Sequence, residues 1–176
     1  KQKYFVGQGF KKLVKQAVEA GDLCFGRDSV IVLNGIHPGT MHFNATRICG
    51  LDATDVVKRT ESELDGRRQI DSVSEFMIKY VPGFEHAFVS TTGSEVGVRE
   101  TRHIEGEYTL TGSDVYNGRK FEDEVSRGYF PIDLHNPDGA TGYGNGGVWK
   151  VPLDTYGIPY RCLVPKHIDG LILSGR

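Results

Sequence analysis

Charged side chains that could bind a substrate or a cofactor are concentrated in the stretch 95–111. Its residues alternate as in a long β-strand or a hairpin, with every second side chain on one face. This count places Glu100 and Arg102 on the apolar face. Burying a charge is unfavourable unless the charge is paired. We therefore expect Glu100 and Arg102 to meet each other, as a structural ion pair, or to meet a ligand.

A second candidate is the histidine in the alternating segment 131–137, where Asp133 and His135 share the polar face. A neighbouring carboxylate can hold an imidazole in one tautomer. Histidine is also the side chain whose ordinary proton affinity lies nearest neutral pH, which suits a general base. His135 is therefore a candidate catalytic base, with a purely structural histidine as the alternative.

The glycine-rich stretch 139–147 contains a formal G-x-G-x-x-G match at Gly142, Gly144 and Gly147. In a dinucleotide-binding site these glycines lie between an apolar strand and the N-terminus of a helix. Here the sequence NPD precedes the glycines and VWKVP follows them. These neighbouring sequences indicate a loop or a hairpin crossing rather than a phosphate-binding loop.

The first half of the chain shows two helical patterns and a pair of strands. A helix is predicted over 9–20, ended by Gly21, and paired strands are predicted at 30–33 and 41–44. A longer helix is predicted over 60–80, opened by a capping box of Thr60 and Glu63. Arg67 lies at the edge of its apolar stripe, either snorkelling to water or paired with a carboxylate or ligand.

The second half predicts a short helix capped by Thr111 and Asp114, and a helical stripe through Phe121, Val125 and Tyr129. Strands are predicted at 158–164 and 171–173. The fold class is therefore α+β, with a mixed, largely antiparallel sheet and the helix 60–80 packed on one face.

Composition excludes several functional classes. With 21 Lys+Arg against 23 Asp+Glu, the net charge of −2 offers no basic field, and we expect no nucleic-acid partner. No window approaches the roughly 20 apolar residues of a membrane span, so a soluble protein without a membrane partner is expected. The odd number of widely spaced cysteines predicts a reducing, cytoplasmic location. Three widely spaced cysteines exclude a disulfide framework and a paired CxxC zinc site, and no metal site is expected.

Several sequence blocks, in the same order along most of the chain, resemble those of bacterial FAD-dependent oxidoreductases of the glutathione-reductase-like superfamily. The most specific is GVRETRH at 97–103, where the family usually has two arginines and this chain has Arg102 and His103. The other blocks are FNATR at 43–47, GLDATD at 50–55, ELDGRRQ at 63–69, YTLT at 108–111, PIDLH at 131–135, IPYRCLVP at 158–165 and GLILSGR at 170–176.

The resemblance implies a partial fragment of a two-domain flavoprotein. The family's Rossmann-type strand, glycine loop and helix are absent from these 176 residues, as is an initiator Met. We expect 1–176 to be a substrate-domain, or cap-type, fragment, with 166–176 starting the segment that returns to the FAD domain. Its partner would be the N-terminal dinucleotide-binding half of the same polypeptide, and an exposed final strand would also allow a homo-oligomer.

The resemblance also implies roles for particular residues. The intact parent would transfer a hydride between a small organic substrate and FAD, whereas the fragment alone would bind no FAD and be inactive. The backbone at Gly175 and Arg176 would approach the cofactor. His135 would be the catalytic base, and the predicted substrate-binding residues are Arg99, Glu100, Arg102 and Arg161.

Two other functions compete with this interpretation. One is a non-catalytic, sugar-binding module that uses Trp149, the tyrosines and the pair Glu100 and Arg102. The other is a carboxylate-based glycosidase or lyase, which needs two carboxyl groups converging on a cleft. No spacing in the sequence selects such a pair, so this class ranks last.

Overall fold

The computed structural model describes residues 6–24, 27–135 and 148–175, which fall into two compact units. The described part of the first unit runs from 6 to 97, and that of the second covers 98–135 and 148–175. Within these ranges, no helix is long and apolar enough to cross a membrane.

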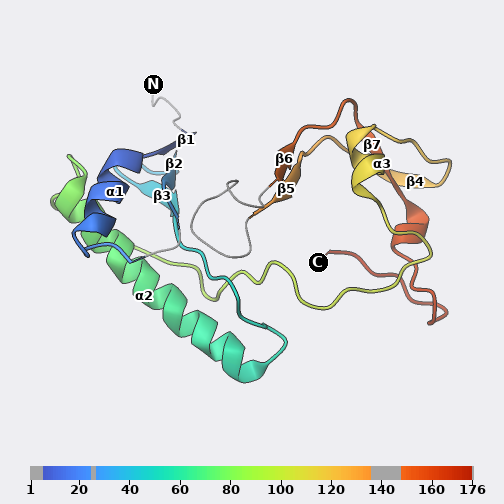
Figure 1. The fold of residues 1–176 in the computed structure, drawn as a ribbon, viewed down its shortest axis with the longest axis horizontal. Coiled ribbons are helices and arrows are strands. Elements are labelled where there is room, and N and C mark those ends of the chain that lie inside the picture. Colours follow the sequence, from blue (N-terminus) through green and yellow to red (C-terminus); the bar gives the residue numbers. More distant parts are fainter. Residues whose placement is uncertain (1–5, 25–26, 136–147, 176) are drawn as a thin grey trace. The chain divides into compact units, whose positions relative to one another are not determined.

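The first unit is built on a three-stranded antiparallel sheet in the order β1 (Val6–Gly9), β2 (Val30–Asn34) and β3 (Met41–Asn44). The predicted pairing of the two later strands is confirmed, with Val32 opposite Phe43. Helix α1 (Lys11–Glu19) connects β1 to β2. It ends before Gly21, whose φ of +76° is incompatible with an α-helix. Figure 1 shows α1 lying against the C-terminal part of the second helix of this unit, α2.

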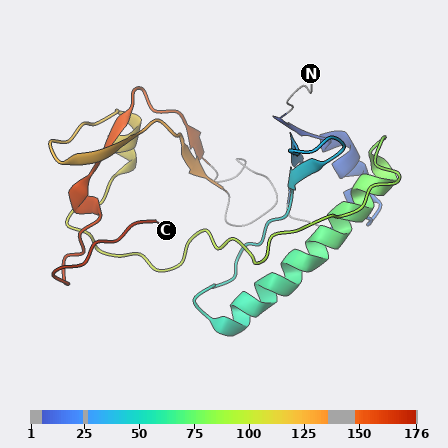
Figure 2. The same ribbon diagram turned by 180° about the vertical axis from the view of Figure 1, so that it is seen from behind.

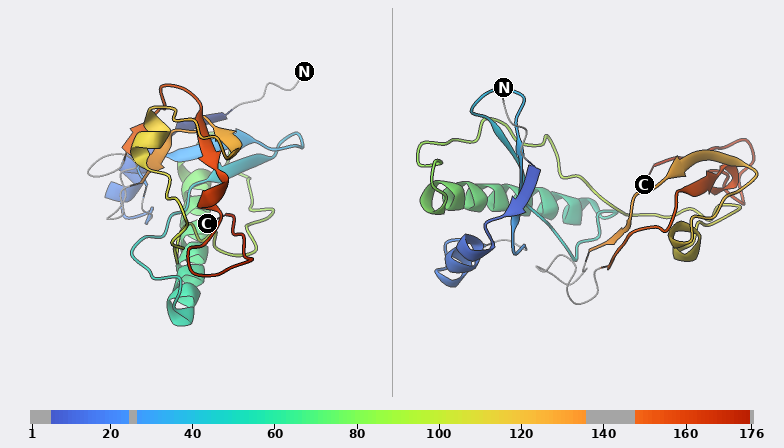
Figure 3. Two further views of the ribbon diagram at one scale, coloured as in Figure 1. Left: turned by 90° about the vertical axis from the view of Figure 1, so that its right-hand side faces the viewer. Right: turned by 90° about the horizontal axis from the view of Figure 1, so that it is seen from above.

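The core of the first unit forms where α1 and α2 (Val56–Tyr80) meet one face of β2. The alternation of β2 sends Val30 and Val32 to this face, and the strands cross α2 steeply (Figure 3). Phe76 is 1% exposed and stacks on Tyr80, with ring centroids 5.6 Å apart. The buried apolar residues are Val14, Ala17, Leu23, Val30, Val32, Ala45, Val73, Phe76, Met77 and Val81.

Helix α2 confirms the predicted long helix, but its start differs. Asp55 is the N-cap, and its Oδ1 accepts hydrogen bonds from the amides of Val57 at 2.7 Å and Lys58 at 3.1 Å. Thr60 lies inside the helix and donates its hydroxyl to the Val56 carbonyl, so the predicted capping box is wrong. Asp55, five residues before Thr60, accepts from the free amides first, so the helix begins earlier than predicted.

The segment 95–111 was predicted as a strand or hairpin and forms neither. Its beginning lies along α2, where the Val96 amide donates to Glu63 at 2.6 Å. Arg67 is exposed and donates to the Thr92 hydroxyl and the Ser94 carbonyl, and in the described residues it forms no ion pair with a carboxylate. Within 95–111, the Val96 amide is thus bonded to a side chain of α2 and not to a neighbouring strand.

The second unit contains two small antiparallel sheets. Strand β4 (Glu124–Gly128) pairs with β7 (Tyr156–Pro159), and β5 (Ile132–Leu134) pairs with β6 (Val148–Lys150). A 3₁₀ turn, η1 (Tyr160–Cys162), follows β7, and helix α3 (Gly112–Tyr116) lies beside β7 (Figure 2). The predicted α+β class is confirmed. The described strands are antiparallel and belong to three small sheets, whereas one sheet was predicted.

Three elements of the second unit differ from the prediction. The strand predicted at 158–164 ends at Pro159 and is followed by the 3₁₀ turn η1. Phe121, Val125 and Tyr129 were assigned to a helix, but β4 begins at Glu124. Residues spaced by four and eight also share one face of a strand, so the periodicity alone does not separate the two structures. Residues 171–173 form no strand, and Leu171 and Ile172 are exposed.

A buried carboxylate organises the second unit. Asp114, in α3, is 5% exposed and accepts hydrogen bonds from the Thr111 amide and hydroxyl, the Tyr108 hydroxyl and the Arg119 guanidinium. The Thr111 hydroxyl accepts from the Asp114 amide, which completes the predicted capping box. Burial disfavours the charged form of Asp114, but these donors outweigh it and hold the pKa of the carboxyl well below its usual range.

Truncation of the first unit's core should be strongly destabilising. Phe76→Ala leaves a cavity between α2 and the sheet, so we expect it to lower the free energy of unfolding by about 3–5 kcal/mol. The matched control is Phe88→Ala, because Phe88 is 83% exposed. Hydrogen exchange of the α2 amides in the full-length protein measures both changes. Equal protection in the two variants would contradict the assignment of Phe76 to the core.

Acid should destabilise the second unit through Asp114. Because the pKa of Asp114 is lowered by folding, its contribution is complete above the ordinary value of 3.8 and is lost as the pH falls below it. We expect Asp114→Asn to lower the stability of the second unit at pH 7 and to flatten its decline at acidic pH. Hydrogen exchange of α3 and β7 between pH 7 and about 3 measures this dependence.

The control for this prediction is Asp169→Asn, since Asp169 is exposed. It should keep the full acid dependence of the wild type. An Asp114→Asn protein with unchanged stability at pH 7 would show that the network around Asp114 contributes nothing.

Candidate functional site

The first cluster of candidate residues surrounds Asp133, in the short strand β5. Pairing with β6 places Asp133 opposite Trp149, and His135 follows the strand. The Asp133 Oδ1 lies 3.2 Å from the His135 Nε2, and both side chains are about one-fifth exposed, 18% and 21%. The predicted contact of this carboxylate with the imidazole is therefore present. It orients the ring and fixes which nitrogen carries the proton.

Arg99 approaches the same carboxylate from the loop that begins the second unit. Its Nη2 lies 3.5 Å from the Asp133 Oδ2 and donates to the Asp133 carbonyl at 3.2 Å. Asp133 thus lies between a guanidinium and an imidazole, and each of its two oxygens faces one of them. Two of the predicted site residues, Arg99 and His135, therefore both contact Asp133. Asp133 itself was predicted only as the neighbour of His135.

The predicted pair of Glu100 and Arg102 is not formed. Glu100 Oε1 instead contacts His103 Nε2 at 2.7 Å, and no ion pair links Glu100 to Arg102 in the described part of the chain. All of these side chains are exposed because the segment carries no strand alternation. Their predicted burial on an apolar face is therefore wrong, and the sugar-binding interpretation loses the charged pair on which it partly rested.

A second cluster forms around the aromatic rings of Tyr108 and Phe121, which meet edge to face with centroids 5.3 Å apart. Arg119 and Arg161 both lie against these rings. The Cζ of Arg119 is 4.8 Å from the Phe121 centroid, and the Cζ of Arg161 is 5.1 Å from the Tyr108 centroid. Guanidinium groups at such distances are attracted to the ring faces.

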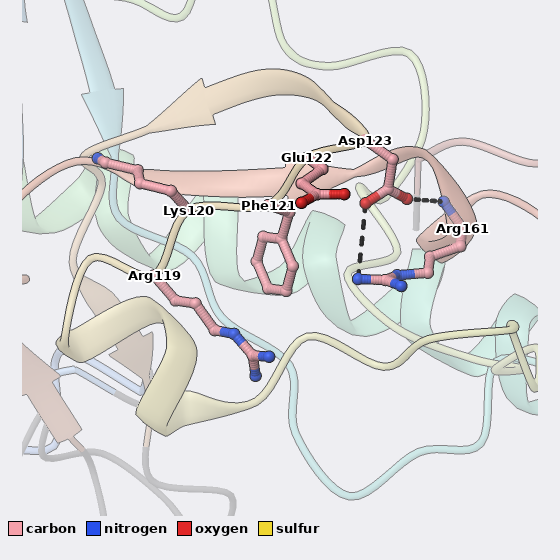
Figure 4. Close-up of a pocket in the computed structure, with 6 residues that line it drawn as sticks. All are labelled: Arg119, Lys120, Phe121, Glu122, Asp123 and Arg161. Atoms are coloured by element: carbon pink, nitrogen blue, oxygen red, sulfur yellow. Dashed lines mark hydrogen bonds and ion pairs between the residues drawn. The ribbon is translucent and has the colours of Figure 1, made fainter.

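The Phe121 ring and the two arginines border an open pocket of about 440 Å³. Figure 4 shows the Phe121 ring between the side chains of Arg119 and Arg161, whereas Lys120 extends away from them. Arg161 contacts Asp123 across the mouth, with 3.5 Å between Nη2 and Oδ1. Residues lining the pocket are Arg119, Lys120, Phe121, Glu122, Asp123 and Arg161.

The Asp114 network fixes one wall of this pocket. Arg119 Nη1 donates to Asp114 at 2.9 Å and to the Tyr108 hydroxyl at 3.0 Å. The hydrogen bond to Asp114 raises the pKa of Tyr108, which keeps the phenol protonated, and Asp114 likewise raises the pKa of Arg119. Arg119 is thus a permanent cation held in one orientation.

Sequence reasoning predicted only Arg161 of this pocket. Arg119, Phe121 and Asp123 were missed because the segment was assigned to a helix. The available signal was the run RKFEDE at 119–124, in which a single aromatic residue is flanked by opposite charges. Within the described residues, no group of three or more His, Cys, Asp or Glu side chains is arranged to hold a metal ion.

The C-terminal residues were tested for their fit to a flavin. Gly175 has a φ of +93°, and no atom lies within 4 Å of the position that a Cβ would occupy. Its backbone is therefore open to close approach by a cofactor, as the resemblance implies. The adjacent Leu171 and Ile172 are 38% and 56% exposed. Arg176, the other predicted cofactor contact, lies outside the described residues, as does the glycine stretch 139–147.

One comparison with known proteins gives a match. A family model described as FAD dependent oxidoreductase matches residues 8–176, almost the whole chain. Comparison with curated proteins and with solved structures found no match. The cofactor of the matched family is FAD. The extent of the match shows that the chain belongs to the family of FAD-dependent oxidoreductases.

Proposed function

We propose that this chain forms the substrate side of a flavoenzyme that transfers a hydride between a small organic substrate and FAD. The observation that carries the proposal is the Asp133 carboxylate, which holds His135 and Arg99 together at the end of β5. A carboxylate, an imidazole and a guanidinium are the groups needed to position a proton acceptor beside a fixed positive charge.

His135 is the proposed general base. Its Nε2 lies 3.2 Å from the Asp133 Oδ1, and the imidazole takes the proton when an alcohol or amine is oxidised. Asp133 stabilises the imidazolium that forms, without itself taking the proton. When bound, FAD supplies the hydride-accepting chemistry that no amino-acid side chain provides.

Arg99 supplies fixed positive charge to this cluster. A guanidinium stays charged at all working pH values and presents a planar fork to anionic groups. We propose Arg99, Glu100 and Arg102 as substrate-binding residues on the exposed loop at 98–105, and Arg161 as a substrate-binding residue of the pocket. In this assignment the loop and the pocket bind different parts of the substrate.

The cofactor contact of this chain is proposed at its C-terminal segment. The backbone of Gly175, and of Arg176 beyond it, would approach the flavin, with 166–176 as the start of the returning FAD-domain segment. The remaining contacts would come from a dinucleotide-binding half of the same polypeptide. On this basis the 176 residues alone bind no FAD and are inactive.

The absorbance spectrum of the purified full-length protein tests the proposal. A yellow protein that retains FAD, compared with a colourless 176-residue chain, is the expected result. A full-length protein that binds no FAD but binds saccharides would overturn the proposal in favour of the sugar-binding module.

Removing the base should slow reduction of the bound flavin without affecting its binding. For the substrate identified from a panel of alcohols and amines, we expect His135→Gln to lower the rate by about 10²–10⁴-fold. Stopped-flow absorbance measures the rate. The wild-type rate should rise with pH through one ionisation, and the variant should lose that rise.

The matched control is His86→Gln, since His86 is an exposed histidine of the first unit. It should reduce its flavin at the wild-type rate. A His135→Gln enzyme with the wild-type rate and pH profile would remove His135 from the chemistry and leave it a structural residue.

A further inference from the structure

We infer that Trp149 and Phe130 bind an aromatic ring of the substrate, attached to the alcohol or amine carbon that is oxidised beside His135. The inference names a substrate class, the arylalkyl alcohols and amines, and two residues that select it. The oxidation of this carbon rests on the proposed function, whereas binding of the ring does not.

Trp149 lies on the same face of the β5/β6 ribbon as the proposed base. It is paired directly with Asp133, and side chains paired in this way have Cβ atoms roughly 4.5–5.5 Å apart. His135 follows two residues after Asp133 and contacts its Oδ1 at 3.2 Å. In an antiparallel ribbon this diagonal position is within reach of an aromatic side chain. A ring bound against Trp149 therefore brings an attached carbon close to the imidazole.

Helix α3 lies against the opposite face of the ribbon. On that face Ile132 is paired with Lys150, whose ammonium lies 3.5 Å from the centroid of the Tyr116 ring in α3. Because side chains alternate along a strand, Asp133 and Trp149 point away from α3. Trp149 is accordingly 49% exposed, and its ring surface is accessible to a ligand.

Phe130 adds a second aromatic surface beside Trp149. The ring centroids are 6.0 Å apart and the ring planes are inclined by 77°. Phe130 is 64% exposed, in contrast to Phe121, which is 8% exposed beneath its arginines. Adjoining apolar groups that remain exposed are typical of binding sites. A third aromatic ring can lie flat on one of these rings and edge-on to the other, which are the two arrangements that aromatic pairs prefer.

The polar groups on this face favour an aromatic ring over a sugar ring. Each Asp133 oxygen already faces a partner, His135 at 3.2 Å and Arg99 at 3.5 Å. A sugar ring carries several hydroxyl groups, which need hydrogen-bond partners when they leave water. The charges of Arg99 and Asp133 compensate each other, which suits an uncharged group at this end of the substrate.

The test is an anaerobic titration of the FAD-loaded, full-length protein with excess 4-fluorobenzyl alcohol, followed by fluorine NMR. We expect saturable binding that is at least about tenfold tighter than that of 2-deoxy-2-fluoro-D-glucose, a sugar with the same reporter nucleus. Trp149→Ala should weaken binding of the aryl alcohol at least about tenfold, and Phe130→Ala about threefold. Trp149→Phe keeps an aromatic surface and should bind within about threefold of the wild type.

The control variant is Phe88→Ala, which removes an aromatic ring that is 83% exposed in the first unit. It should leave binding unchanged. Equal weakening by Trp149→Ala and Phe88→Ala would overturn the inference, as would tighter binding of the fluorinated sugar than of the aryl alcohol. Phe130→Ala keeps the test decisive if Trp149→Ala does not fold.

The two proposals fail separately. A protein that retains FAD but shows no saturable binding of the aryl alcohol, or shows binding that Trp149→Ala leaves unchanged, loses the ring site and keeps the flavoenzyme function. Trp149-dependent binding to a full-length protein without FAD establishes the ring site and removes the flavoenzyme. Release of FAD by Trp149→Ala would assign this side chain to the cofactor and overturn the inference.

Discussion

The buried carboxylate of Asp114 is the interaction on which the second unit depends. It joins the loop that carries Tyr108, the start of α3 at Thr111 and the turn that carries Arg119. Each of these segments would otherwise expose backbone or side-chain donors with no partner. Because one carboxylate satisfies all three, the aromatic rings and the guanidinium beside them have fixed positions, and the pocket at Phe121 is a consequence of that arrangement.

Asp133 joins neighbouring side chains in a similar way, but its side chain is more exposed than that of Asp114. It lies between Arg99 and His135, much as Asp114 lies between Arg119 and Tyr108. In both places an acidic side chain holds a cation and a group that can donate a hydrogen bond. Both clusters belong to the same unit, so the proposed roles of its residues require no assumption about how the two units are arranged.

Sequence patterns predicted the elements that depend on local chemistry. The stripe of α2 with Val73 and Met77, the cap at Thr111 and the contact of Asp133 with His135 all follow from spacing. The stretch at 95–111 was misassigned because side chains of α2 and carbonyl groups near the C-terminus take its hydrogen bonds, as between Glu107 and Val164. No local pattern reveals such partners.

In the candidate site, too, local contacts were predicted from the sequence and long-range contacts were not. Strand alternation placed Asp133 and His135 together, but Arg99 entered only through the resemblance, because its contact spans 34 residues. Arg119 and Phe121 were missed since their grouping with Tyr108 and Arg161 is a product of tertiary packing. Composition and periodicity indicate the chemistry that a residue can perform. Its long-range contacts become known only from the fold.

The chain belongs to the FAD-dependent oxidoreductases, and the proposed roles of His135 and Arg99 are a proton acceptor and a fixed positive charge beside the bound flavin. The most direct test is a crystal structure of the full-length protein with FAD. The account predicts that the His135 imidazole faces the cavity bordered by the flavin ring and that the Gly175 backbone touches the cofactor. A flavin bound with no residue of the second unit along its ring would contradict it.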